Sequence, residues 1–265
     1  MKNYLGYSPS DHLLPYAKFY QETMADTPGY VLEALKKSPL PIGSIPGPEE
    51  AGMMANPGYQ DIETGYCLEK DGAIRVSILT KMPHVLPVMW NWWFGWHGCS
   101  SDRYKLWHPK AHLSAKWKDG SVDTSYLNRI SLIEEFIGGK LEKAAIRFVS
   151  PTTFGLQVAS ESTENQDVFI CARISFSQFP LDIGYLLHQI RVTEGGSEMR
   201  SRFWLGGQYL QLQGNNLFCR ILSDLIRYLK KPAPNQAAAL LLHCWEEMNH
   251  LAGFLPELYR EFSNR

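Results

Sequence analysis

The chain has 265 residues, enough for one large domain or for a main domain with a small appendage. Its formal net charge is −1, which argues against nucleic acid or an anionic membrane surface as a partner held by bulk electrostatics. Hydrophobic residues make up 45% of the chain and charged residues 20%, as in an ordinary globular protein. No apolar run approaches the roughly 18 residues that a membrane span needs.

The cysteines indicate a reducing compartment. There are five of them, an odd number, and no two form a CxxC pair. Met1 leads into a polar, proline-bearing stretch rather than into the apolar core of a signal peptide. We therefore predict reduced thiols and a cytoplasmic protein.

Residues 1–60 differ from the rest of the chain. Residues 16–24 and 30–37 are predicted to form short helices, and the proline-rich run 39–48 can be neither a helix interior nor a central strand. This pattern predicts a small N-terminal unit with an extended arm, separate from a main domain at residues 61–265. Such a unit packs either on a second subunit, giving a homodimer, or around its own domain.

The main domain begins with strand-like sequence. A hairpin signal at Lys70-Asp71-Gly72 separates the first two predicted strands. The aromatic run 87–97 is predicted to be a buried helix. The predicted strands are residues 62–69, 73–82, 129–137, 141–150, 153–160, 168–176, 185–194 and 199–205.

The C-terminal part is predicted to be helical. Residues 214–231 form an amphipathic pattern, Pro232 ends it, and Asn235 can cap a second helix that runs to about His250. Pro256 is expected to kink or interrupt that helix. An antiparallel sheet followed by a long C-terminal helix predicts an α+β helix-grip (START-like) fold, in which the curved sheet wraps the helix around a cavity for an apolar ligand.

The most informative pair of residues lies on that last helix. His243 and Glu247 are four residues apart, so they share one helix face with side-chain roots about 6 Å apart. An imidazole and a carboxylate so placed can hold two positions of one zinc ion. The same spacing also occurs by chance, and Glu246 points away from this face. A carboxylate on a core-facing helix nevertheless needs a positive partner, and a metal is one.

Three further regions carry candidate residues. Tyr104 and His112 lie eight residues apart in a cluster with His97 and His108, although each histidine by itself is more often structural. In a strand, Glu142 shares an apparently inward face with Ala144, Ile146 and Phe148, so it is either a metal ligand or a solvated residue at the strand entrance. His188 lies in an apolar strand; it is a proton-transfer candidate if it faces the cavity.

No nucleophile elbow, P-loop or dinucleotide fingerprint is present. The four regions, in this order, resemble the diacetylphloroglucinol hydrolase / phloretin hydrolase family from about residue 60 to 255. The resemblance implies a helix-grip fold with an N-terminal dimerisation segment, and cleavage of the carbon–carbon bond between an acyl group and a phloroglucinol ring by zinc-activated water. It also implies a small aromatic ketone as substrate.

The resemblance further assigns roles to single residues. Glu142 is preferred over Glu135 as the middle metal ligand, on spacing and on strand phase. Tyr104 is expected to bind a ring hydroxyl of the substrate and His188 to carry the proton. The implied zinc ligands are His112, Glu142, His243 and Glu247.

Two positions depart from the family pattern. Ala115 and Phe203 stand where the family has an Asn and a Tyr that orient the substrate. The departures put diacetylphloroglucinol in doubt and make a mono-acylated phenol, or a larger dihydrochalcone such as phloretin, at least as good a candidate. Two other functions remain open from the sequence, a helix-grip carrier without catalysis and a metal-dependent esterase.

Overall fold

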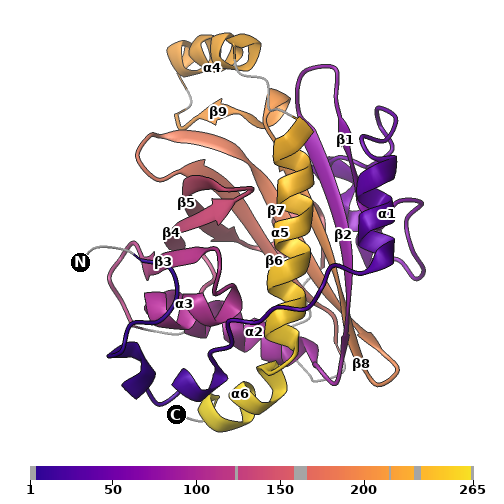
Figure 1. Cartoon of the computed structure of the whole chain (residues 1–265). Coiled ribbons are helices and arrows are strands. Elements are labelled where there is room, and N and C mark those ends of the chain that lie inside the picture. The colour runs from indigo at the N-terminus through magenta and orange to yellow at the C-terminus, as the bar shows by residue number, and fades with distance from the viewer. Residues whose placement is uncertain (1–3, 123–124, 158–165, 215, 230–233, 264–265) are drawn as a thin grey trace.

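The structure is a computed structural model that describes residues 4–122, 125–157, 166–214, 216–229 and 234–263. Figure 1 shows its main feature, a curved sheet with one long helix, α5 (Pro234–Ala252), lying across one face. No helix in these ranges is long and apolar enough to cross a membrane.

The sheet has nine strands, and every neighbouring pair is antiparallel. The strand order is β1-β2-β8-β7-β6-β5-β4-β3, with β9 paired to β7. The strands are β1 (Gly65–Leu68), β2 (Ile74–Pro83), β3 (His112–Trp117), β4 (Ile130–Ile137), β5 (Lys140–Val149), β6 (Val168–Phe176), β7 (Leu181–Thr193), β8 (Gly196–Leu205) and β9 (Gln211–Leu212).

Helices close the concave side of the sheet. Helix α5 contacts β1, β2 and β4, so it bridges the two ends of the strand order. Helices α2 (Pro87–Trp96) and α3 (Ser101–Trp107) lie near the C-terminal end of α5 (Figure 1). The remaining helices are α1 (Gly29–Lys37), α4 (Leu217–Leu229) and α6 (Leu255–Phe262). This arrangement confirms the helix-grip prediction.

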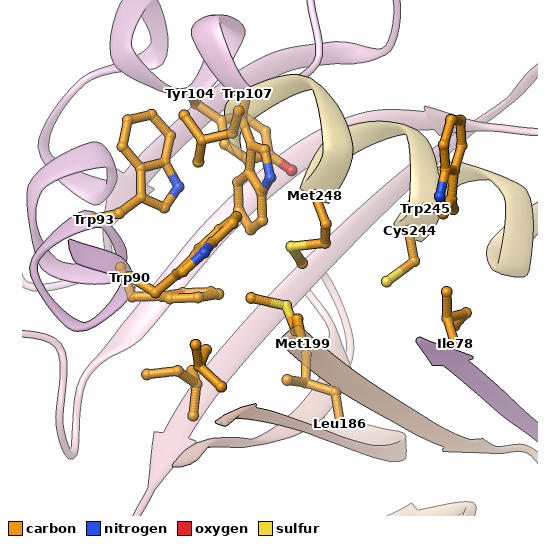
Figure 2. Packing of buried hydrophobic residues seen from close by; sticks show 14 of the residues in the cluster. Ile78, Trp90, Trp93, Tyr104, Trp107, Leu186, Met199, Cys244, Trp245 and Met248 are labelled. Atoms are coloured by element: carbon orange, nitrogen blue, oxygen red, sulfur yellow. The ribbon is translucent and has the colours of Figure 1, made fainter. Parts of the chain in front are cut away.

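Alternation along the strands explains why the sheet grips α5. On β8, Met199 and Phe203 belong to the main core, whereas Arg200 and Arg202 bond to residues of the chain that precedes β1. Adjacent strand residues point to opposite faces, so the apolar set lies toward the helix. Figure 2 shows Met199 of β8 close to Met248 of α5, beneath the tryptophans of α2.

The N-terminal segment packs on its own chain. The Tyr7 hydroxyl donates to the Asp102 carbonyl oxygen of α3 at 2.7 Å, and the Trp245 indole N–H of α5 donates to the Tyr30 hydroxyl at 3.1 Å. The segment therefore wraps around the main domain, which was one of the two expected arrangements. These contacts leave the homodimer a prediction.

Most predicted elements are confirmed within a few residues, and two are wrong. Within residues 16–24 only the short 3-10 turn Ala17–Phe19 forms. The Phe19 side chain packs in the core against Phe262 of α6, and this contact replaces the expected helix. The expected strand 153–160 is wrong at its start, where Pro151–Phe154 forms a 3-10 turn capped by Ser150, while residues 158–160 lie outside the described ranges. Pro256 interrupts the C-terminal helix as expected and opens α6.

Candidate metal centre

Three elements bring a cluster of histidines and carboxylates together at the concave face. His112 is the first residue of β3 and lies opposite Glu135 of β4 in the strand register. His243 and Glu247 are on α5, on one face as the four-residue spacing predicted. One potential ligand atom from each of His112, His243 and Glu247 lies within 4.8 Å of the others, and all three residues are buried.

The distances show that Glu135 belongs to the same cluster. Its Oε2 lies 3.3 Å from the Nε2 of His112 and 3.6 Å from the Nε2 of His243. The Oε2 of Glu247 lies 3.4 Å and 3.8 Å from the same two nitrogens. Two imidazole nitrogens and two carboxylate oxygens thus converge on one small volume.

The tautomer of His112 is set by its other ring nitrogen. Its Nδ1 lies 3.0 Å from the backbone carbonyl oxygen of Tyr104, which can only accept a hydrogen bond. The Tyr104 ring stacks on the imidazole at 3.8 Å with an interplanar angle of 3°. In the neutral ring, Nδ1 therefore carries the proton and Nε2 presents a lone pair to the cluster, the orientation found in metal-binding histidines.

The cluster lacks a positive partner. The Nε2 atoms of His112 and His243 are buried without a well-aligned hydrogen bond, and no lysine or arginine in the described ranges forms an ion pair with Glu135 or Glu247. Lone pairs facing carboxylate oxygens repel unless a proton or a cation lies between them. This donor set fits a divalent metal such as zinc.

In the absence of a cation, only protons can offset the negative charge of the two carboxylates, and the pKa shifts show which groups hold them. Burial raises the pKa of Glu247 above its usual range, more than His112 and His243 lower it. Burial would also raise the pKa of Glu135, but hydrogen bonds to the two histidines hold it well below its usual range. Burial lowers the pKa of His112, but the two carboxylates outweigh this and raise it to about 9. A bound cation would replace that shared proton.

The structure does not bring Glu142 into the cluster. Glu142 lies directly opposite Glu135 in the β4–β5 register, so it does share the inward face of the sheet. Its strand is one further from β3, however, and its carboxylate pairs with the Lys140 ammonium at 2.7 Å. Glu142 therefore has the surroundings of a partly solvated residue near the strand entrance. The carboxylate that joins the cluster is that of Glu135.

Tyr104 lies beside the cluster as expected. Its hydroxyl donates a hydrogen bond to the Oε2 of Glu135, and burial together with the nearby carboxylates raises its pKa well above the usual value. His108, from the same predicted histidine cluster, stacks on His243 at 4.9 Å and bonds to Glu246 at 3.3 Å. His97 bonds to the Trp93 carbonyl oxygen at 2.8 Å, a structural role.

His188 faces the concave side but is not part of the cluster. It lies on β7 opposite Ser201 of β8 and Ile170 of β6. Its Nδ1 is 2.8 Å from the Ser201 hydroxyl, and its ring stacks near Phe94 of α2 at 5.8 Å. Burial lowers its pKa to about 3, so the imidazole is neutral.

Ser201 was not predicted as a site residue. The signal for it lies in the β7–β8 hairpin, whose tight turn at Gly195 fixes which residues face each other. Counting back from Thr193 opposite Gly196 places His188 opposite Ser201. The glycine pair Gly195-Gly196 is therefore the sequence signal that fixes Ser201 opposite His188.

Fold and site together define a helix-grip protein with a candidate metal centre between the sheet and the C-terminal helix. The family profile described as DAPG hydrolase PhiG domain matches residues 45–260, most of the chain. The chain belongs to this family and is accordingly an enzyme, a hydrolase that acts on carbon–carbon bonds.

Two named relatives, a diacetylphloroglucinol hydrolase and a phloretin hydrolase, agree with this assignment. The chain is 26% identical to a "2,4-diacetylphloroglucinol hydrolase" of Pseudomonas sp over 94% of its own length and 88% of that protein. It is 28% identical to the "Phloretin hydrolase" of Eubacterium ramulus, over 97% of its own length and 93% of that protein. Among solved structures, Ara h 8.0201 superimposes over 70% of the chain and 99% of that protein, at 11% identity and a TM-score of 0.39.

Proposed function

We propose that this enzyme hydrolyses the bond between an acyl carbon and a polyhydroxylated aromatic ring, using a bound zinc ion. The observation that carries the proposal is the convergence of two imidazole nitrogens and two carboxylates on one point, where no lysine or arginine of the described residues pairs with the carboxylates. The relatives' names, which refer to diacetylphloroglucinol and phloretin, supply the substrate class.

The proposed zinc ligands share one property: each presents a nitrogen or oxygen atom to the same volume from β3, β4 or α5. Zinc held there would act as a Lewis acid and bring the pKa of a water molecule toward neutrality. Tyr104, through its hydrogen bond to Glu135, holds one carboxylate in place. The ligands are His112, Glu135, His243 and Glu247.

The substrate ring must accept a proton, because an aryl carbanion is a poor leaving group. Hydroxyl groups ortho and para to the acyl group let the ring take up a proton at the acyl-bearing carbon, after which the carbon–carbon bond breaks and the ring leaves as a phenol. The products are a carboxylic acid and the arene, and one water is consumed. The enzyme therefore needs a group that moves a proton.

His188 is our candidate for that group. It is neutral and buried, so its free nitrogen can take a proton from the attacking water and return it to the ring carbon. The Tyr104 hydroxyl can bind a ring hydroxyl when substrate enters. Both roles follow the expectations from the sequence and remain proposals.

Two apolar side chains of the site restrict which substrates it can bind. Ala115 is buried on β3, and Phe203 lies edge-on to His188 at 5.7 Å. Neither side chain can hydrogen-bond a second acyl group. We therefore favour a mono-acylated phenol or a dihydrochalcone such as phloretin over diacetylphloroglucinol. The five cysteines form no disulfide, which agrees with the proposed cytoplasmic location. A homodimer is proposed from the resemblance alone.

Product analysis tests this proposal. Purified protein is stripped with a chelator, reloaded with zinc and incubated with phloretin, a mono-acylated phloroglucinol and a phenyl ester. We expect a phenol and a carboxylic acid from the ketones, with activity that returns only on zinc addition. Hydrolysis of the ester alone, or zinc-independent turnover, would overturn the proposal.

A further inference from the structure

His188 has a single polar contact in an otherwise apolar pocket. The side chain is 3% exposed, and its ring lies against Phe94 and Phe203. Within the described ranges, the Ser201 hydroxyl is the only hydrogen-bond partner of the imidazole, at 2.8 Å from Nδ1. The orientation of this ring, and which nitrogen carries its proton, therefore depend on one serine.

The Ser201 hydroxyl can accept a hydrogen bond as well as donate one, because its oxygen carries two lone pairs. It can therefore receive the Nδ1–H of His188 across the 2.8 Å contact. In a neutral imidazole only one ring nitrogen carries a proton, so Nε2 is then unprotonated.

We propose that Ser201 is a positioning residue that holds His188 with its proton on Nδ1, so that Nε2 stays free to take up and return the catalytic proton. The inference rests on the proposed function of His188. It adds a residue that acts through its contact with His188.

The contact matters most when His188 is charged. Once Nε2 accepts a proton from the attacking water, the Nδ1–H to Ser201 bond becomes charge-assisted, and no other described residue accepts a hydrogen bond from this ring. The proton then leaves Nε2 for the ring carbon, and His188 returns to its neutral form. Removal of the hydroxyl should therefore lower kcat about 10- to 100-fold, the factor expected for one hydrogen bond to a charged group.

A purely structural role for Ser201 makes a different prediction. It would change stability or metal content but leave the proton-transfer step alone. Ser197 offers a matched control, because it lies on the same strand and the same face four residues away, and its buried hydroxyl has no hydrogen-bond partner in the described ranges. Ser197→Ala removes the same group without a link to His188.

The test compares Ser201→Ala, Ser201→Thr, Ser197→Ala and His188→Gln in the zinc-loaded, full-length protein. We expect Ser201→Ala to keep about one zinc per chain and a KM within about twofold of wild type while kcat falls about 10- to 100-fold. Ser201→Thr should recover most of kcat, and Ser197→Ala should match wild type. If Ser201→Ala kept full kcat while His188→Gln lost it, or if Ser201→Thr gave no recovery, the inference would be overturned.

A second readout does not depend on turnover. Nitrogen-15 NMR of histidine-labelled protein reports which ring nitrogen is protonated. The resonance missing in His188→Gln identifies the residue. We expect an Nδ1–H tautomer in wild type that is lost in Ser201→Ala; an Nε2–H tautomer in wild type, or an unchanged spectrum, would refute the inference. Absence of hydrolysis in wild type would instead refute the proposed function.

Discussion

Two buried clusters of charge lie on opposite faces of the same sheet, and their partners differ. On the outer face, Glu63 accepts hydrogen bonds from the Arg200 and Arg202 guanidinium groups, each at 2.6 Å. On the inner face, the polar partners of Glu135 and Glu247 among the described residues are imidazoles and a tyrosine hydroxyl. The outer carboxylate is paired with permanent cations, whereas the inner pair is not.

The difference indicates that the two clusters have different roles. A carboxylate paired with two arginines needs no further partner. Here the pair of salt bridges holds the segment before β1 against β8. A pair of buried carboxylates facing histidine lone pairs is costly unless a cation joins them. The outer cluster should therefore respond to mutation through stability alone, and the inner cluster through metal binding and activity.

The largest expected effect follows from removing a ligand of the inner cluster. His243→Ala should lose bound zinc and reduce kcat/KM by at least about 1000-fold, because a proposed metal ligand and the adjoining charge balance are lost together. Elemental analysis and the product assay measure both. Glu246→Gln, on the same helix but paired with His108, is the control and should keep its zinc. Full metal and activity in His243→Ala would refute the site.

The matching change on the outer face should act on stability. Glu63→Gln leaves Arg200 and Arg202 buried with a neutral partner, and the free energy of unfolding should fall by about 3 kcal/mol. Denaturant unfolding measures this. Zinc content and KM should stay unchanged, so a variant that lost zinc would show that the two faces are coupled and would break the comparison.

Glu135 and Glu142 provide a matched pair across two neighbouring strands. Glu135→Gln should weaken zinc binding about 10- to 100-fold, because an anionic ligand becomes neutral while the fold is kept. Glu142→Gln should change zinc affinity by less than about threefold, since only the surface contact with Lys140 is lost. Competition with a zinc chelator measures both. The reverse order of effects would restore Glu142 as the ligand.

The smallest effect concerns pH. Burial would raise the pKa of Glu63, but the hydrogen bonds and charges of Arg200 and Arg202 lower it below its usual value. Its contribution to stability is therefore complete above the ordinary carboxyl pKa, about 4.3, and is lost as the pH falls through the lowered value. The stability difference between wild type and Glu63→Gln should be constant at neutral pH and shrink in acid. A difference that grew as the pH fell would contradict this sign.

The sequence predicted those features that depend on local spacing. The face shared by His243 and Glu247 follows from helical periodicity, and the inward face of β5 follows from alternation. The choice between Glu135 and Glu142 could not follow, because both lie on inward faces and only the strand order shows which strand adjoins His112. Strand order is set by contacts between distant segments, which periodicity does not contain.

The short elements escaped prediction for a similar reason. Helix α3 has only seven residues and β3 has six. The adjacent residues His112 and Leu113 are both buried, so the start of β3 lacks the alternation typical of a strand with one exposed face. Their conformation depends on packing against each other and on α5 rather than on a repeating pattern. They nevertheless carry Tyr104 and His112. The types and spacing of these residues indicate the site even though α3 and β3 themselves are not predicted.

Anomalous X-ray diffraction from zinc-loaded crystals, recorded on either side of the zinc edge, tests the central claim most directly. The account predicts one strong peak per chain about 2.0 to 2.2 Å from the Nε2 atoms of His112 and His243 and from oxygens of Glu135 and Glu247. A peak beside Glu142, or no peak at the inner cluster in protein that hydrolyses its substrate, would contradict it.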